Sequence, residues 1–377
     1  MIALGRELAA RGHDVTLQTW GRWRPDVEAL GMRFEAAPEY HVFPTLERPL
    51  KPYEAVERAT RSTEPLIAAL APDVVVADIL TLAPALAAER LGVPWATLVP
   101  HVWPVGERGW APYSLGAKLP RTAVGRRLWG SMDRLVGIGL ERGRVELNET
   151  RRRLGMAPLD RVHGGQSPSL VLVATLPELE YPRDWPEHVH VVGPLQFELD
   201  HPGDPELPPG DAPLVLVAPS TAQDPDHTLL HAALDGLAGE DVRVLATWNR
   251  RLPSRPLRVA ANARAVDWLS YARTMPRSDL VISHAGHGTV MRALTAHVPL
   301  LAVPAAGDMN ENAARLAWAG LGVRLPRRFA TPRAIRVATR HALADTALRA
   351  RVRALDPPDG GARAADLLEA FAVRHTN

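Results

Sequence analysis

The segment 279–322 decides the fold, and it reads D-L-V-I-S-H-A-G-H-G-T-V-M-R-A-L-T-A-H-V-P-L-L-A-V-P-A-A-G-D-M-N-E-N-A-A-R-L-A-W-A-G-L-G. Residues 280–283 form an apolar run that ends in His284, and a turn with two glycines separates this run from apolar residues at helical spacing. A second apolar run, 300–303, lies between two prolines and leads into the polar loop 307–310. Strand, turn, helix, strand, loop and helix in this order predict part of an open parallel sheet covered by helices.

The glycine turn is suited to an anionic ligand. Gly286 and Gly288 let the backbone come close to a ligand, and the helix after them directs free N–H groups and the positive end of its dipole to the same point. A glycine turn alone is a weak signal. Here, however, the polar loop with Asp308 leaves the neighbouring strand, and open parallel sheets bind ligands at such adjacent strand ends.

In residue type and spacing, the segment resembles the donor-binding signature of the nucleotide-sugar-dependent glycosyltransferases. This family includes the plant secondary-product enzymes and the bacterial antibiotic glycosyltransferases of the erythromycin and calicheamicin type. The matching positions are His284, Gly286, Thr289, Pro299, Pro304, Asp308, Asn312 and Ala313. The resemblance implies an α/β protein of the GT-B fold, with two Rossmann-like domains facing each other across a cleft. It also implies inverting transfer of a hexosyl group from a UDP- or TDP-sugar to a hydroxyl of a small, apolar acceptor.

The resemblance assigns the main donor-binding roles within this segment. His284 is expected to contact the diphosphate, and Gly286, Gly288 and Thr289 to offer it backbone amides and a hydroxyl. Asp308 is expected to accept hydrogen bonds from the sugar. Each position has a structural alternative: His284 as a cap of the strand end, the glycines as an ordinary turn, and Asp308 as an Asx-type turn.

Donor-binding residues are also expected outside this stretch. Ser220 and Thr221 match a small hydroxyl position near the phosphates, or they cap the first strand of their domain. Trp268 matches the tryptophan on which the nucleotide base stacks, or it belongs to the core. His287, between the two glycines, is expected to be an exposed turn residue.

Two positions depart from the family pattern. Met309 follows Asp308 where the family usually has Gln, and Met cannot donate a hydrogen bond to a hydroxyl. This favours a deoxysugar donor, unless Asn310 takes over the role. Arg292 stands where the plant enzymes have a Glu that holds the ribose, and Arg has no acceptor. We expect Arg292 to face solvent or to reach a phosphate, and the nucleotide base is not predicted.

The first half of the chain has candidate residues for proton transfer. Residues 73–78 read as a buried parallel strand, and Asp78 lies at its carboxyl end. In the resembled family, an Asp at such a strand end orients the catalytic His and stabilises its charge. His101 follows the next strand on the same rim. We expect it to line the acceptor pocket with Trp103 and Trp110, or to act as the base itself.

The beginning of the sequence reads as the second part of a β-α-β unit. Residues 2–11 predict a helix and 14–19 a strand, whereas no strand and no N-cap precede the helix. We therefore expect the first strand and its loop, which carry the catalytic base in the resembled family, to be encoded before Met1. A start codon assigned too late would explain this. His13 lies at the other end of the helix and is expected to be structural.

Proline and glycine divide the chain. The stretch 195–212 has the composition of a linker. We predict an acceptor-binding domain over 1–194 and a nucleotide-sugar-binding domain over 213–355. In the remainder, 356–377, an amphipathic helix is expected to pack back onto the first domain.

Composition limits the class of protein. The 377 residues are 46% hydrophobic and 23% charged, as is typical of about two soluble domains. No apolar run is long enough to span a bilayer, and no signal peptide is recognised. The absence of cysteine excludes disulfides and thiolate chemistry, and it fits a cytoplasmic protein. A net charge of +2 without a basic, aromatic-rich stretch argues against a nucleic-acid partner.

No metal or other cofactor is expected, because no D-x-D pair lies on a plausible strand-end loop and the resembled family holds its diphosphate without metal. The nucleotide sugar is a co-substrate, and the oligomeric state is not predicted. Two other interpretations stay open at this point. One is a nucleotide-sugar epimerase of the same architecture, against which the Asp308 loop argues. The other is a non-catalytic, donor-binding or auxiliary GT-B protein.

Overall fold

The computed structural model describes residues 1–38, 52–199, 206–220 and 224–376. Its second half is built on a six-stranded parallel sheet with the order β12-β11-β10-β7-β8-β9. The strands are β7 (Leu214–Ala218), β8 (Arg243–Thr247), β9 (Ala263–Val266), β10 (Leu280–Ser283), β11 (Leu300–Ala302) and β12 (Gly322–Arg324). The chain moves outward from β7 in one direction as far as β9, and then returns to the other side of β7 with β10. The sheet therefore has a topological switch point between β7 and β10, where their carboxyl ends flank a crevice.

Apolar strands hold this sheet in the core. Every residue of β7 and β10 is buried, and the two strands pair in register from Leu280 opposite Val215 to Ser283 opposite Ala218. Such continuously buried strands are typical of parallel sheets with helices on both faces. The helices of this half are α7 (Thr228–Leu237), α8 (Tyr271–Thr274), α9 (His287–Thr295), α10 (Asp308–Ala319), α11 (Pro332–Ala344) and α12 (Thr346–Arg353).

The polar stretch 307–310 is not the open loop that the sequence predicts. Gly307 has φ +56° in the left-handed region, which glycine adopts without strain, and α10 begins directly after it. Asp308 and Asn310 are thus residues of the first helical turn. The helix N-terminus, rather than a flexible loop, fixes their positions.

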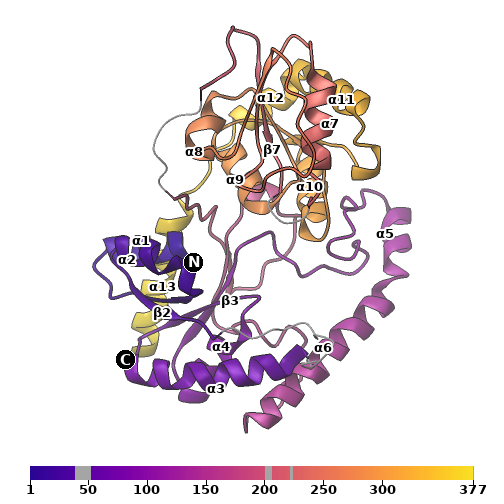
Figure 1. Cartoon of the computed structure of the whole chain (residues 1–377). Coiled ribbons are helices and arrows are strands. Elements are labelled where there is room, and N and C mark those ends of the chain that lie inside the picture. The colour runs from indigo at the N-terminus through magenta and orange to yellow at the C-terminus, as the bar shows by residue number, and fades with distance from the viewer. Residues whose placement is uncertain (39–51, 200–205, 221–223, 377) are drawn as a thin grey trace.

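The described residues of the first half form two separate parallel sheets. Four strands, in the order β3-β4-β5-β6, form the larger one, and β1 pairs with β2 alone. Their bounds are β1 (Thr16–Thr19), β2 (Arg33–Ala36), β3 (Val75–Asp78), β4 (Trp95–Val99), β5 (Val171–Val173) and β6 (Val189–Val191). The helices are α1 (Ile2–Ala10), α2 (Arg24–Ala29), α3 (Pro52–Leu70), α4 (Leu82–Leu91), α5 (Ala123–Gly130) and α6 (Asp133–Arg153). Figure 1 shows α5 at the edge of the molecule, and α6 runs from there to α3, on which its last turns pack.

The last helix, α13 (Gly360–Thr376), returns to the first half and lies beside α1 (Figure 1). Phe371 and Leu368 join the buried cluster that contains Leu4 and Leu172. His13, just after α1, bonds through Nε2 to Glu369 Oε1 of this helix at 2.9 Å. Among the helices that the structure describes, none is both long and apolar enough to cross a membrane.

Candidate active site

The switch point brings together residues far apart in the sequence. His284 follows β10 and Ser220 follows β7, and the Ser220 N–H donates a 2.8 Å hydrogen bond to His284 Nδ1. Two residues singled out from the sequence therefore meet at the crevice that the strand order creates. Thr221, the third candidate here, lies outside the described residues.

His284 is enclosed by the protein, with 2% of its surface exposed. Since Nδ1 accepts from Ser220, the ring proton is on Nε2, which lies 3.4 Å from Asp224 Oδ2. Both ring nitrogens thus have partners in the chain. The imidazole connects the end of β7 to Asp224, behind the turn that follows β10.

Asp224 is a site residue that the sequence reasoning missed. It is 1% exposed, and it accepts hydrogen bonds from the Thr228 hydroxyl and, at 3.0 Å, from the Leu229 N–H. Burial raises the pKa of this carboxyl, but the hydrogen bonds from His284, Thr228 and Leu229 outweigh burial and hold the pKa well below its usual range. An acid in the loop four residues before α7 was the available signal. It did not indicate that the same carboxylate would face His284.

The glycine turn leads directly into α9. Gly286 is the N-cap, so the N–H groups of His287, Gly288 and Thr289 have no acceptor within the helix. A Cβ placed on Gly288 would meet no atom within 4 Å, and one on Gly286 would meet only Met309 Cε, at 4.0 Å. The space before this helix end is therefore open to a ligand and is bordered by the beginning of α10.

The beginning of α10 supplies the side chains expected at the sugar. Asp308 and Met309 are half-buried in its first turn. The Cβ of Asn310 packs against Gly116 of the first half, at 3.0 Å from the position of a Cβ on that glycine. The methyl group of Met309 borders the space beside Gly286, and Asn310 lies against Gly116 of the other half of the molecule.

Arg292 has neither of its expected roles. Its guanidinium lies 3.5 Å from Glu198 Oε2 and donates to the Phe197 carbonyl, both in the linker. It therefore fastens α9 to the linker rather than reaching a phosphate or facing solvent. Trp268, in contrast, is half-buried directly after β9, and the Arg250 guanidinium lies 5.3 Å from its ring centroid.

Asp78 and His101 lie at the carboxyl ends of β3 and β4 in the first half. Asp78 Oδ1 accepts a 2.8 Å hydrogen bond from the Leu80 N–H. His101 Nδ1 bonds to the Val102 carbonyl at 2.8 Å, so Nδ1 carries the proton and Nε2 has a free lone pair. The His101 ring lies 6.2 Å from that of Tyr113, centroid to centroid.

The structure differs from the expectations for Trp103 and His287. Trp103 is buried in the core against Trp185, so it does not line an open pocket. Trp110 stands edge-on to Tyr181, and the Arg183 guanidinium covers its face. His287 is not an exposed turn residue.

His287 reaches across to the first half, where its Nε2–H donates to the Ala174 carbonyl at 2.9 Å. Burial lowers its pKa to about 4. The sequence could not show this, because the neighbour of the turn comes from a strand end 113 residues away.

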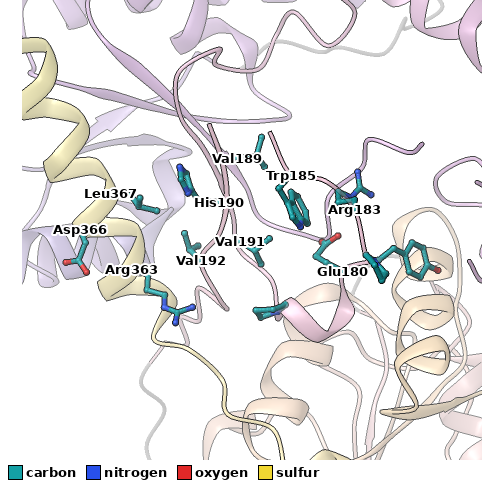
Figure 2. A pocket seen from close by; sticks show the side chains of 13 residues that line it. Glu180, Arg183, Trp185, Val189, His190, Val191, Val192, Arg363, Asp366 and Leu367 are labelled. Atoms are coloured by element: carbon teal, nitrogen blue, oxygen red, sulfur yellow. The ribbon is translucent and has the colours of Figure 1, made fainter. Parts of the chain in front are cut away.

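A hollow of about 830 Å³ opens elsewhere, between β6, residues 177–185 and the start of α13 (Figure 2). Its walls include Trp185, Val191 and Arg363. None of the residues around the switch point lines it. It is therefore separate from the site at the ends of β7 and β10.

Comparison with known proteins agrees with this architecture. Residues 231–357 match the family model of the erythromycin biosynthesis protein CIII-like C-terminal domain. The 4'-demethylrebeccamycin synthase of Lentzea aerocolonigenes is 30% identical, over 99% of this chain and 92% of that protein. The O-mycaminosyltylonolide 6-deoxyallosyltransferase of Streptomyces fradiae is 29% identical, over 94% and 89%. The crystal structure of CalG4, the calicheamicin glycosyltransferase, superposes with a TM-score of 0.73 at 25% identity, covering 99% of this chain and 94% of that one.

Two domains built on parallel sheets, with a ligand crevice at the switch point of the second, define an α/β protein of the GT-B fold. The chain belongs to the family of antibiotic-type, erythromycin CIII-like nucleotide-sugar glycosyltransferases. It is a glycosyltransferase that moves a sugar from a nucleotide diphosphate sugar to a small-molecule acceptor. The epimerase interpretation is therefore set aside.

Proposed function

We propose that this enzyme transfers a hexosyl group with inversion to a hydroxyl of an apolar acceptor. The observation that carries the proposal is the anion-binding corner at the switch point, where the Ser220–His284 bond adjoins the free amides of α9. A diphosphate held there would present its sugar toward the first half. The acceptor oxygen would then attack the anomeric carbon on the face opposite the diphosphate.

The second half stabilises the leaving group. The bond between the anomeric carbon and the diphosphate oxygen breaks, and its electron pair stays on the diphosphate. The amides of Gly288 and Thr289 and the dipole of α9 face that developing charge, which such preorganised donors stabilise. His284 lies between Asp224 and the Ser220 N–H and contacts both. These contacts fix the chain after β7, on the side of the site opposite α9. Trp268 offers an aromatic face to the base.

The donor is proposed to be a UDP- or TDP-activated sugar, and a deoxysugar is favoured. Asp308 accepts from the sugar hydroxyls at the start of α10, whereas Met309 beside it offers an apolar surface. A thioether suits a carbon that has lost its hydroxyl. The 6-deoxyallosyltransferase among the relatives carries a deoxysugar in its name.

Proton transfer is assigned to the rim of the first half. Asp78 would orient a histidine base and stabilise its charge. His101 has its Nε2 lone pair free for a proton and is one candidate for this base. A loop that precedes α1 is the other, as the family resemblance implies. In support of the second candidate, β1–β2 and β3–β6 are both parallel but form no ladder with each other among the described residues, and one more strand between them would make a single Rossmann-like sheet.

The proposed domains are 1–194 for the acceptor and 213–355 for the nucleotide sugar, joined by 195–212. The remainder, 356–377, belongs with the first domain because α13 packs on α1.

The test separates donor binding from transfer. TDP and UDP binding are measured by calorimetry, and transfer from α-configured TDP-sugars to phenolic acceptors is followed by NMR of the anomeric proton. Binding of a nucleotide diphosphate with a β-configured product supports the proposal. An α-configured product overturns inversion, and no binding of TDP or UDP overturns the donor site. The same assays on His101→Gln identify the base. They are run in this chain and in a chain extended in frame upstream. If His101→Gln abolishes transfer in both chains, His101 is the base; if the extended chain transfers the sugar even with His101→Gln, the base lies upstream.

A further inference from the structure

A buried ionic cluster joins the two halves of the molecule. It consists of Arg315 and Glu311 on α10 and Glu180 directly after the 3-10 helix η2 (Pro177–Leu179), and all three side chains are buried. Arg315 Nη1 lies 2.5 Å from Glu180 Oε2, and Arg315 Nε lies 2.8 Å from Glu311 Oε1. One guanidinium of the donor half therefore binds a carboxylate of each half.

Backbone groups of the first half complete the cluster. Arg315 Nη2 donates to the Trp103 carbonyl at 2.9 Å, and the Trp103 N–H donates to Glu180 Oε1 at 2.7 Å. The Ser114 N–H lies 3.3 Å from Glu311 Oε2. Three separate segments of the first half thus converge on two side chains of α10.

Aromatic side chains surround the Arg315 guanidinium. The Arg315 guanidinium lies 4.5 Å from the centroid of the Tyr181 ring, which stands edge-on to Trp110 and Trp318. Figure 2 shows Glu180 beside Arg183 and Trp185 at the edge of the hollow in the first half. An apolar interface tolerates small shifts, whereas a buried guanidinium loses directional hydrogen bonds when either half moves.

The cluster lies on the helix that begins at the sugar site. Asp308, Glu311 and Arg315 follow one another at the spacing i, i+3, i+7, which places them along one side of α10. The first-half segment that meets Arg315 begins two residues after His101, on the acceptor rim. Because Asp308 and Arg315 belong to the same helix, fixing the position of Arg315 also fixes the position of Asp308.

We propose that Arg315 and Glu180 are positioning residues that align the donor sugar with the acceptor by docking α10 on the acceptor-binding half. This inference rests on the proposed sugar contact of Asp308. Reacting atoms must be held about 3–3.5 Å apart, and a misplacement of about 1 Å can lower the rate about 100-fold. The nucleotide itself is bound by the second half alone, so its affinity does not depend on the docking.

The chain contains a matched control. Arg151 is a buried arginine with the same type of bonds, in which Nη1 and Nη2 each lie 2.8 Å from an oxygen of Glu89 and Nε donates to the Ala157 carbonyl at 2.7 Å. All three residues belong to the first half. Replacing Arg151 disrupts the ion pair of a buried arginine with a partly exposed carboxylate, Glu89, without touching the contact between the halves.

The experiment compares Arg315→Met and Glu180→Gln with Arg151→Met. TDP affinity is measured by calorimetry. Transfer from TDP-6-deoxyglucose to 4-nitrophenol and hydrolysis of the same donor by water are measured in the same reaction. For Arg315→Met we expect TDP affinity within about threefold of the parent, transfer lower by about 100-fold, and a larger share of donor lost to water. Glu180→Gln, which keeps an acceptor for the Trp103 N–H, should give the same shift to a smaller degree, and it serves if Arg315→Met does not fold.

Arg151→Met should lower the unfolding temperature while leaving the ratio of hydrolysis to transfer unchanged. An unchanged ratio in both cluster variants, or the same change in Arg151→Met, overturns the positioning role. A parent chain that binds no TDP overturns the proposed function instead, so the two failures are distinguishable.

Discussion

Replacing Asp224 by Asn should weaken both the second domain and its hold on the nucleotide. The carboxylate has one oxygen facing the Thr228 hydroxyl and Arg327 Nη2, and the other facing the Leu229 N–H and His284 Nε2. An asparagine of the same shape can keep its oxygen on the Leu229 side. Its amide group then faces Thr228, whose hydroxyl can turn to accept.

The expected cost follows from these contacts. Asp224→Asn removes the charge of a buried hydrogen-bond acceptor. Hydrogen bonds to charged groups contribute about 1.5–3 kcal/mol to stability, whereas neutral ones contribute about 1 kcal/mol. Arg327 is largely exposed and adds little. We expect the free energy of unfolding to fall by about 2 kcal/mol in Asp224→Asn and by about 4 kcal/mol in Asp224→Ala, which leaves the buried donors without an acceptor.

The pH dependence gives an independent check. The hydrogen bonds to Asp224 hold its folded-state pKa below the usual value of 3.8, despite burial. The charged carboxylate therefore contributes stability above its unfolded-state pKa, and this contribution is lost as the pH falls through the folded-state value. The difference between the parent and Asp224→Asn should be constant from pH 7 to pH 5 and should shrink below about pH 4.

Urea unfolding from pH 7 to pH 3 measures this difference, and calorimetry with TDP measures the ligand affinity. We expect TDP binding to weaken about tenfold, since His284 loses a charged partner and the Ser220 amide loses its support. Asp235→Asn, an exposed acid on α7, is the control and should change stability by less than about 0.5 kcal/mol. Equal stability of Asp224→Asn and the parent at pH 7 would refute the reasoning.

Four further outcomes are expected. Gly288→Ala should leave the unfolding temperature unchanged or slightly higher, because the added Cβ meets no atom within 4 Å. The same Cβ fills the approach to α9, so TDP binding should weaken at least about tenfold. Unchanged affinity would place the phosphates elsewhere. Met309→Gln should shift preference about tenfold toward TDP-glucose over TDP-6-deoxyglucose in competition assays, since the amide gives a hydroxyl its partner, and no shift would contradict a sugar contact there. Trp268→Ala should cost about 1–3 kcal/mol of TDP binding and Trp268→Phe much less; equal losses would indicate a core role. His287, with its pKa lowered to about 4, should make the domain contact lose stability as the pH falls from about 6.5 to 4, where the unfolded chain takes up the proton first, and this slope should be missing in urea unfolding of His287→Gln.

The strands and helices of the second domain could be predicted from sequence because each is coded locally. The apolar run 280–283 is a strand with those bounds, and the run 300–303 contains the strand Leu300–Ala302. The stretch 307–310 was wrong as a loop for a local reason as well. Gly307, read as part of a turn, is the residue that starts α10.

The contact between the domains could not be predicted in this way. From the sequence, Arg315 reads as a polar residue on a helix surface. Its partners Glu180 and Trp103 lie more than 130 residues away along the chain. His287 was misjudged for the same reason, since it was assigned to an open surface that the other domain covers. Trp103 was misjudged because side chains of its own half, among them Trp185, bury it. Local patterns report which face of an element is apolar, and they carry no information about which element covers it.

His284 shows how the two kinds of information combine. The resemblance assigns it to the diphosphate, whereas the structure has both of its nitrogens bonded, to Ser220 and toward Asp224. An imidazole that accepts at Nδ1 has a single proton, at Nε2, and that proton faces a carboxylate whose pKa is held low. To donate to a phosphate through Nε2, His284 must therefore leave Asp224, because the one proton that could reach the diphosphate already faces another group of the second domain.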